Sequence, residues 1–276
     1  MNSASAATTP MNAQPVRDAF DQAAPTYDQD WSDSIIGRLQ RQAVWNAVDP
    51  LFVAGDRVLD VGCGTGVDAF HLSQCGVRVH AVDVSPGMVA QVDRRIDREG
   101  LSDQVTAEVC AIEDLEGLDV EQPFDGAVSN FSPLNCVEDL EPVAESLGRL
   151  IRPDGKLVLC VMTRFCLWET LWYPLTSQLY KAARRWRKAN VTATVSSSGE
   201  FDVFYHSAGE IEAALSAFRL VGDRGVGIFV PPSYLEPWAE RFPRTVKICA
   251  AIDRVINRWP LFRSIGDHRL LIFERR

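Results

Sequence analysis

The sequence predicts an α/β fold in which helices cover both faces of a mainly parallel sheet. Two observations carry this prediction. A short apolar strand at 58–61 runs into a glycine-rich turn at 62–66, and the apolar spacing of a helix follows from Val67. A second strand at 77–84 then begins at the distance of a strand–helix–strand unit, whose two strands are parallel, and it ends in Asp83.

The turn after the first strand suits a nucleoside-like ligand. Glycine has no Cβ, so a ligand can lie against the backbone at Gly62 and Gly64. At the end of the second strand, the carboxylate of Asp83 can accept hydrogen bonds from both hydroxyls of a ribose. The G-x-G-x-G spacing is one residue shorter than the dinucleotide-binding G-x-G-x-x-G. Asp60 would repel a pyrophosphate, but it suits a cationic amino group.

The run D-V-G-C-G-T-G at 60–66, with D-V-S-P-G-M at 83–88, resembles the class I S-adenosylmethionine-dependent methyltransferases. S-adenosylmethionine carries an ammonium and a sulfonium but no phosphate, which accounts for both Asp60 and the shorter glycine spacing. The resemblance covers residues 16–164. It implies a Rossmann-like seven-stranded mixed sheet, and S-adenosylmethionine as the cofactor with S-adenosylhomocysteine as its product.

The remaining strands are expected in the order that the resemblance implies. The third and fourth are at 105–111 and 124–131. A helix, a Pro-Asp-Gly turn at 153–155 and a fifth strand follow. The sixth strand is expected at 218–230, and the seventh, at 268–274, lies beside it as the one antiparallel strand.

The resemblance also implies cofactor contacts along these elements. The expected residues are Tyr27, Asp60, Gly62, Cys63, Gly64, Gly66, Asp83, Val84, Met88, Ile112, Glu113, Ser129, Asn130 and Phe131. Relatives commonly carry an aspartate after the third strand that reaches the adenine amino group. This chain has Cys-Ala-Ile-Glu at 110–113, so the backbone amide of Ile112, apolar contacts and Glu113 are the expected replacement.

The N-terminal region divides into a tail and a cover. Residues 1–14 are rich in Ala, Ser, Thr and Asn, and are predicted to be disordered. The F-D-x-x-A-x-x-Y-D run at 20–28 resembles the segment that closes over the cofactor in quinone-type and related small-molecule methyltransferases, and Tyr27 is the matching aromatic residue. An aromatic face beside a sulfonium gains about 0.5–2 kcal/mol. Alternatively, Tyr27 packs the helical cover at 15–48 onto the sheet.

Residues 15–276 are predicted to form a single domain whose core is 50–164 and 200–276. Two insertions, at 165–195 and 233–260, are predicted to form helical lids on it. In the first insertion, one helical face contains Trp168, Leu171, Trp172, Leu175 and Leu179. Pro174 is expected to kink or restart this helix. A cluster of basic residues follows: Lys181, Arg184, Arg185, Arg187 and Lys188. The segment is a lid over a hydrophobic pocket, a surface that docks on an anionic membrane or phosphate-bearing substrate, or an ordinary helix packed on the core. The second has apolar spacing at Trp238, Phe242, Val246, Ile248, Ile252, Val255 and Ile256.

The candidate catalytic residues lie near the last helix. The stretch 191–199 is a strand or a loop, and Ser207 with Glu210 predicts a capping box for the helix that follows. Related enzymes place this approach at the mouth of the active site, so Tyr205 and His206 are candidate substrate contacts, His206 is a candidate general base, and Asn135 can orient the acceptor. Because methyl transfer is an in-line displacement, alignment matters most, and a base is needed only for a protonated nucleophile.

Composition and motifs narrow the function. A net charge of −9 and a pI near 5.0 argue against a polyanion binder. At 130–134 this chain has N-F-S-P-L in place of the family's amine-binding N/D-P-P-Y/F motif, which argues against methylation of nucleic-acid or protein amines. No transmembrane run or signal peptide is expected, and no metal site. Seven cysteines without C-x-x-C spacing favour reduced thiols in the cytoplasm.

The sequence therefore predicts a cytoplasmic methyltransferase that acts on a small hydrophobic molecule. Two alternatives stay open: a lipid or quinone methyltransferase that works at the membrane surface, and a catalytically silent S-adenosylmethionine-binding partner protein. The sequence does not specify the acceptor, the methylated atom or the oligomeric state.

Overall fold

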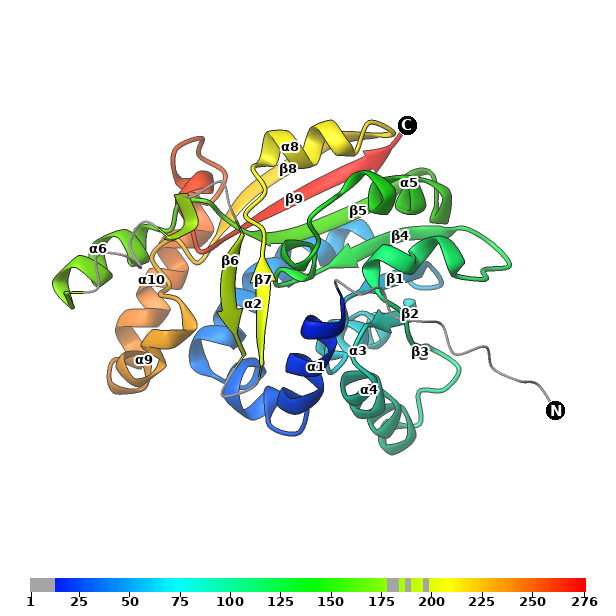
Figure 1. The fold of residues 1–276 in the computed structure, drawn as a ribbon, viewed down its shortest axis with the longest axis horizontal. Helices are drawn as coiled ribbons and strands as arrows, with labels where there is room; N and C mark the ends of the chain where they lie inside the picture. Colours follow the sequence, from blue (N-terminus) through cyan, green and yellow to red (C-terminus); the bar gives the residue numbers. More distant parts are fainter. Residues whose placement is uncertain (1–12, 178–183, 187–189, 196–198) are drawn as a thin grey trace.

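A computed structural model describes residues 13–177, 184–186, 190–195 and 199–276. Its centre is one seven-stranded sheet (Figure 1). In spatial order the strands are β3 (Val105–Val109), β2 (Arg78–Asp83), β1 (Arg57–Val61), β4 (Phe124–Ser129), β5 (Ile151–Met162), β9 (His268–Arg275) and β8 (Phe218–Val226). Each neighbouring pair is parallel except those of β9, which runs antiparallel to both β5 and β8. The predicted mixed sheet is confirmed, and its last strand lies between the fifth and sixth.

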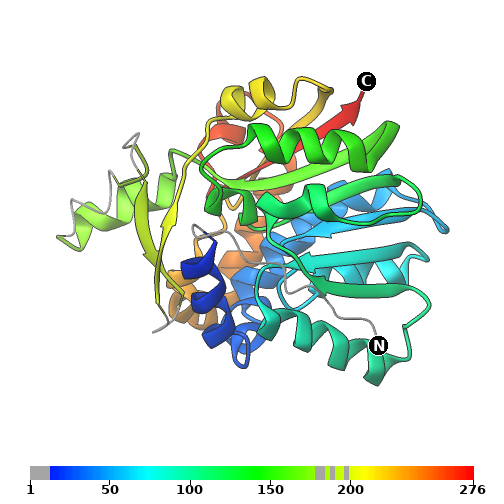
Figure 2. The same cartoon turned by 45° about the vertical axis from the view of Figure 1, so that its right-hand side comes forward.

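Helices cover both faces of this sheet, as predicted (Figure 2). They are α2 (Ile35–Val48), α3 (Val67–Gln74) and α4 (Pro86–Glu99) on one side, and α5 (Glu141–Leu150) and α8 (Ala208–Ala214) on the other. Successive strand residues point to opposite faces. In β5, Leu157 packs with the α5 side, whereas Val158 packs with the α2 side. This alternation gives two apolar cores, one on each face.

Two strands differ from their predicted form at glycine-containing segments. The Pro-Asp-Gly segment is not a turn before the fifth strand but a bulge within β5, where Asp154 has φ 62° and the pairing with β4 shifts register. The sixth strand ends earlier than expected, at Val226, because Gly227 takes a positive φ of 66° that turns the chain out of the sheet.

A cover lies over the carboxyl ends of the central strands. It consists of α1 (Gln14–Ala23) and an antiparallel hairpin of β6 (Val191–Thr194) and β7 (Glu200–Val203). Val16 and Ala19 of α1 pack against Phe201 and Val203 of the hairpin. The hairpin resolves the first part of the ambiguous 191–199 stretch as a strand, Val191–Thr194. Helix α1 begins inside the segment predicted to be disordered, whose residues 1–12 lie outside the described part.

The two insertions pack on each other. They contain α6 (Leu167–Leu175), α9 (Glu236–Arg241) and α10 (Pro243–Ile256). Trp168 lies 6.2 Å from Trp238 between ring centroids, and Trp168 and Trp172 pack on the α9–α10 cluster. Leu171 and Leu175 are 58% and 81% exposed. The two tryptophans of α6 therefore pack against the second insertion, whereas Leu171 and Leu175 face solvent.

The basic cluster after α6 also differs from its prediction. Arg185 is buried, and its guanidinium forms ion pairs of 2.8 Å with both Glu169 and Asp267. It cannot serve as an exposed contact to a membrane. Pro174 lies one residue before the end of α6, so the helix stops there instead of kinking. Leu179, Lys181, Arg187, Lys188 and the side chain of Arg184 fall outside the described part.

Within the described residues, no helix combines the length and the apolar composition that crossing a membrane requires. Those residues also contain no group of three or more His, Cys, Asp or Glu side chains placed to hold a metal ion.

Candidate functional site

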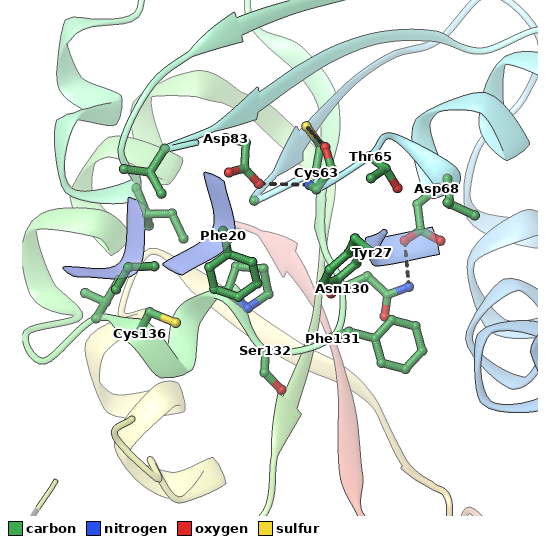
Figure 3. Close-up of a pocket in the computed structure, with 18 of the residues that line it drawn as sticks. Phe20, Tyr27, Cys63, Thr65, Asp68, Asp83, Asn130, Phe131, Ser132 and Cys136 are labelled. Carbon is green, nitrogen blue, oxygen red and sulfur yellow. Dashed lines mark hydrogen bonds between the residues drawn. The ribbon is translucent and has the colours of Figure 1, made fainter. Parts of the chain in front are cut away.

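A cavity opens at the carboxyl ends of β1, β2 and β4, beneath α1 (Figure 3). It holds about 870 Å³, counting the part open to solvent. Its walls are Ala13, Val16, Phe20, Tyr27, Arg41, Gly62, Cys63, Gly64, Thr65, Val67, Asp68, Asp83, Val84, Ile112, Glu113, Asn130, Phe131, Ser132, Pro133, Cys136 and Val137. Ligand sites of open α/β sheets lie at this edge.

The glycine turn forms the floor. Gly62, Gly64 and Gly66 have φ of 71°, 55° and 80°, a region that side chains disfavour. A Cβ on Gly62 would lie 2.3 Å from the Pro133 side chain, so only glycine fits there. A Cβ on Gly64 would meet nothing within 4 Å and would take up space in the cavity. The turn thus exposes backbone to any ligand present.

Asp83, the last residue of β2, lies on one side of the cavity. Its Oδ2 accepts the Gly64 N–H at 2.8 Å, and its Oδ1 accepts the Ser85 N–H at 2.9 Å. Desolvation raises the pKa of its carboxyl group to about 6, although the two backbone hydrogen bonds oppose the shift. Each carboxylate oxygen keeps a further lone pair for a ligand hydroxyl.

On the opposite side, Asp68 connects three elements. Its Oδ1 accepts the indole N–H of Trp45 at 2.6 Å. Its Oδ2 accepts the side-chain amide of Asn130 at 3.0 Å and a guanidinium N–H of Arg41. Among the described residues, Arg41 is the one lysine, arginine or histidine that lines the cavity. Sequence analysis identified neither Arg41 nor Asp68; the Arg-x-x-x-Trp spacing on α2 was the available signal.

Several buried oxygens of β1, of the end of β4 and of the segment after β4 have no hydrogen-bond partner within the described residues. They are Oδ2 of Asp60, Oδ1 of Asn130 and the hydroxyls of Ser129 and Ser132. Asp60 is 1% exposed, and burial, followed by the charge of Asp68, raises its pKa well above the usual range. A buried carboxyl oxygen without a hydrogen-bond partner is unfavourable. The site therefore favours a ligand that brings a cation or hydrogen-bond donors.

The chain after β4 is turned sharply toward the cavity. Phe131 and Ser132 have φ of 58° and 78°, although neither is glycine. Such residues cost about 1–3 kcal/mol each and concentrate at functional sites. The centroid of the Phe131 ring lies 4.8 Å from the Arg41 guanidinium and 5.3 Å from the centroid of the His268 ring, which is nearly perpendicular to it. The aromatic ring thereby covers the buried cation.

The side of the cavity farther from Arg41 is more apolar. Val84 and Ile112 form part of its wall, together with Glu113, whose pKa is raised by burial. Cys63 also lines the cavity, and burial raises its pKa well above the usual range, so the thiol stays protonated and packs passively. The predicted contact Met88 is fully buried behind the wall.

The structure thus divides the predicted cofactor residues. Asp60, Gly66, Met88 and Ser129 lie behind the cavity surface, and the other ten are on it: Tyr27, Gly62, Cys63, Gly64, Asp83, Val84, Ile112, Glu113, Asn130 and Phe131. Ten residues from five separate segments meet at one cavity.

The F-D-x-x-A-x-x-Y-D segment holds the cover in place. Asp21 accepts the Ser85 hydroxyl and, at 2.7 Å, the Gly87 N–H at the start of α4. Asp28 accepts the Thr65 hydroxyl at 2.6 Å, which joins the segment to the glycine turn. Between them, Tyr27 lies in the cavity wall, and desolvation raises its pKa to about 12. Tyr27 therefore packs the cover and faces the cavity at once.

The three predicted catalytic residues lie outside the cavity wall. Asn135 is fully buried; its amide donates to the Phe204 carbonyl and accepts the Met162 N–H, both at 2.8 Å. His206 donates from Nε2 to the Val137 carbonyl at 2.8 Å, and Tyr205 packs in the α1–hairpin cluster. These contacts join the hairpin to the sheet. The predicted catalytic roles of these three side chains stay predictions, and the contacts described here are structural.

The described residues of the two insertions also lie away from the cavity wall. The prediction that they form lids over it finds no support there, and α1 and Tyr27 cover the cavity instead. The reason is local: Trp168 and Trp172 find apolar partners on α9 and α10.

Comparison with known proteins identifies a family whose model matches part of this chain. Residues 58–155 match the model of a methyltransferase domain family. The demethylmenaquinone methyltransferase of Clavibacter sepedonicus is 34% identical over 143 residues, 51% of this chain and 55% of the relative. The ubiquinone biosynthesis O-methyltransferase of Xanthomonas euvesicatoria pv. vesicatoria is 34% identical over 120 residues, 41% of this chain and 46% of the relative. The chain spans about half the length of the curated relatives it matches.

A solved structure extends the likeness over nearly the whole chain. The [4+2]-cyclase SpnF matches with a TM-score of 0.61 over 98% of this chain and 97% of that one, at 17% identity. At that identity the likeness concerns the fold alone. Because the matched protein is named as a cyclase, the reaction has to be argued from the site and not from the fold.

Proposed function

Since the chain belongs, through residues 58–155, to the class I S-adenosylmethionine-dependent methyltransferases, we propose that it transfers a methyl group from S-adenosylmethionine to a small, largely apolar acceptor. The observation that carries this proposal is the pairing of opposite chemistries in one cavity. Arg41 supplies a cation close to the unpaired buried oxygens of Asp60 and Asn130, and Asp83 supplies a carboxylate on the other side.

These residues fit the proposed cofactor group by group. Its carboxylate suits the guanidinium of Arg41, and its ammonium suits the amide oxygen of Asn130, with Asp60 behind the cavity surface. Its ribose hydroxyls suit Asp83, and its adenine suits the apolar surface at Ile112. No phosphate has to be accommodated, which agrees with a carboxylate-rich cavity.

When bound, S-adenosylmethionine supplies a methyl group on a positively charged sulfur, which is already electrophilic. The chain's part is to bind and to align. Arg41 and Asp83 hold opposite ends of the cavity, and alignment of the reacting groups is worth about 7–11 kcal/mol. Tyr27 and α1 exclude water from above. Because its pKa is raised to about 12, Tyr27 stays protonated at neutral pH and does not act as a base.

The acceptor is best placed under α1. Val16, Phe20 and Val137 give this part of the cavity an apolar wall, which suits a small hydrophobic molecule. The described lining contains no histidine, and we propose that transfer relies mainly on alignment and that an acceptor proton passes to water. A nucleic-acid acceptor is disfavoured by the net charge of −9.

Quinones are a specific subclass of such acceptors. The two curated relatives are named for demethylmenaquinone and ubiquinone biosynthesis, which favours a quinone-like acceptor as a second candidate. A cytoplasmic location is supported by the cysteines, all seven of which are free thiols, as expected in a reducing compartment.

Arg41→Met tests the assignment of the cofactor. Losing a charge-assisted hydrogen bond should weaken S-adenosylmethionine binding by about 1.5–3 kcal/mol, or ten- to a hundredfold, in calorimetry. 5′-Methylthioadenosine lacks the amino-acid end, so its affinity should not change. Arg38→Met, on the same helix but outside the cavity wall, is the matched control. Equal losses for both ligands, or no binding of S-adenosylmethionine to the wild type, would refute the proposal.

Turnover separates an enzyme from a silent partner. The wild-type protein is incubated with labelled methyl donor and a panel of phenols, quinols and other apolar acceptors. Label transferred to any of them establishes catalysis. Tight cofactor binding without transfer to any acceptor would favour the silent cofactor-binding partner.

A further inference from the structure

The outer face of α10 is apolar and exposed. Ile248, Ile252 and Val255 follow one another at helical spacing, and Trp259 and Leu261 lie in the turn after the helix. Their exposed fractions are 61%, 43%, 70%, 56% and 67%. We call these five residues the α10 face. Figure 1 shows α10 on the outside of the molecule, beside α9. A contiguous exposed apolar patch of this kind marks an interaction site.

The orientation of α10 is fixed from its inner side. The carboxylate of Asp253 accepts backbone N–H groups of Ile228, Phe229 and Val230 at 3.0, 2.8 and 3.1 Å. Val246 is fully buried on the same side. Rotating the helix to bury its outer face would break all three hydrogen bonds. The apolar face is therefore a stable feature of the folded protein.

A basic stripe runs beside the α10 face. Arg244, Lys247, Arg254 and Arg258 are exposed and form no ion pair within the described residues. The one acidic residue of α10, Asp253, is buried on the opposite side. Four unpaired cations beside five exposed apolar residues are unusual on a chain of net charge −9. This combination suits an anionic surface with an apolar interior.

A cavity at the rim of the stripe gathers three arginines. Arg224 of β8 lines it together with Arg254 and Arg258, and the lining acid Asp253 is already engaged by backbone amides. Burial, and then the charge of Arg258, lowers the pKa of Arg224. Like charges brought together in this way are relieved by an anion between them. A phosphate group has the charge and the acceptor oxygens for that place.

We propose that α10 docks this protein on a bilayer of anionic phospholipid, with the α10 face at the acyl boundary and a lipid phosphate against Arg224, Arg254 and Arg258. Docking does not depend on the reaction at the cofactor cavity. Its consequence does rest on the proposed function: a docked methyltransferase lies where apolar acceptors partition.

A second copy of the chain is the competing occupant. In a two-fold dimer the same surface lies on both sides of the interface. The basic stripe of one copy would then face that of the other across a shared apolar contact, and the like charges would repel. An anionic bilayer satisfies both the apolar and the basic residues at once.

Vesicle flotation of the full chain tests the proposal. The wild type should bind vesicles of phosphatidylcholine with phosphatidylglycerol at low salt, bind vesicles of phosphatidylcholine alone far less, and lose most binding at high salt. Ile252→Ser/Val255→Ser should lower the affinity at least tenfold. Arg254→Gln/Arg258→Gln should lower it about 25-fold, because each basic residue near such a surface contributes about fivefold.

Matched controls remove similar groups elsewhere. Val53→Ser/Val221→Ser changes two valines that are 67% and 47% exposed outside α10, and Arg94→Gln/Arg98→Gln removes two arginines of α4. Both should bind like the wild type, and all variants should keep wild-type affinity for S-adenosylhomocysteine, which separates docking from the cofactor site.

Three results would overturn the docking proposal. They are no binding of the wild type to anionic vesicles at low salt, equal losses in the test and control variants, and a wild-type dimer in light scattering that Ile252→Ser/Val255→Ser converts to a monomer. A protein that docks but does not bind the cofactor would refute the proposed function alone.

Discussion

Replacing Asp83 by asparagine tests the ribose assignment through its pH dependence. In the folded chain, burial raises the pKa of this carboxyl group to about 6. Ribose hydroxyls donate to the ionised form, so cofactor binding requires the carboxyl group to lose its proton. The affinity for S-adenosylmethionine should therefore rise as the pH passes through this pKa.

The size of the effect follows from that value. With a pKa of about 6, roughly a tenth of the Asp83 carboxyl groups are ionised at pH 5 and roughly nine-tenths at pH 7. Affinity should increase about tenfold over this range, or about 1.4 kcal/mol. Asp83→Asn cannot ionise, so this increase should disappear. At pH 7 the variant should bind about ten- to a hundredfold more weakly, because a charge-assisted pair of hydrogen bonds is lost.

Calorimetry between pH 5 and 7 measures both quantities. The α-amino group of the cofactor, with an ordinary pKa of about 7.7–8.0, stays largely protonated in this window. Asp60 and Glu113 also have raised pKa values, so the ratio of wild-type to variant affinity is needed to isolate Asp83. Asp114→Asn, outside the cavity wall, is the control and should follow the wild-type curve. A ratio that stays constant from pH 5 to 7 would refute the reasoning.

The same shift has a consequence for the stability of the protein without cofactor. The folded pKa of Asp83 lies above its ordinary value of 3.8, so the folded state holds this proton more tightly than the unfolded state. Its contribution to stability is complete below about pH 4 and is lost as the pH rises to about 6, by about 3 kcal/mol. Denaturant unfolding of Asp83→Asn across this range should lack that change.

Three further predictions concern stability and catalysis. Arg185→Met should lower the free energy of unfolding by about 3–5 kcal/mol, because Glu169 and Asp267 keep buried charges without their cation. Urea unfolding measures this loss. Asp253→Ala should cost about 2–4 kcal/mol in the same assay, since three backbone N–H groups lose their acceptor. His206→Ala should change labelled-methyl turnover less than threefold, because its ring donates to a backbone carbonyl.

Exposed residues provide the controls for the stability measurements. The Arg98 side chain is 71% exposed, so Arg98→Met should change the free energy of unfolding by less than about 0.5 kcal/mol. Asp97→Ala, also exposed on α4, should behave alike. An Arg185 variant as stable as these controls would show that the buried ion pairs contribute nothing. A hundredfold loss of turnover in the His206 variant would restore it as a catalytic candidate.

The order of the strands and helices could be predicted from the sequence because its signals are local. Alternating or continuous apolar runs identify β1, β2, β4 and β9 within a few residues of their observed bounds. The glycine turn is equally local: Gly62 and Gly64 are required by their own backbone conformation. The two acids next to them, Asp60 and Asp83, then indicate the kind of ligand. The family resemblance supplied the antiparallel seventh strand.

The charged and polar contacts of the site could not be predicted from the sequence, because they are tertiary. Arg41 lies 27 residues before Asp68 in the chain, and nothing in the local pattern of α2 shows that its side chain turns toward the cavity. The reverse holds for Asn135 and His206. Their residue types suggest a catalytic role, but in the fold their polar atoms form hydrogen bonds that hold the hairpin. A polar side chain acquires its role from the partner that packing brings to it.

Apolar periodicity likewise specified helices but not which face is buried. Val246, Ile248, Ile252 and Val255 read as one apolar series in the sequence, but only Val246 lies in the core. Asp253 decides the rotation of α10, because its carboxylate binds the three amides that follow β8. The sequence by itself determined the elements and the chemistry of the glycine turn. Tertiary structure decided which side chains meet, because burial and charge pairing depend on segments that are distant along the chain.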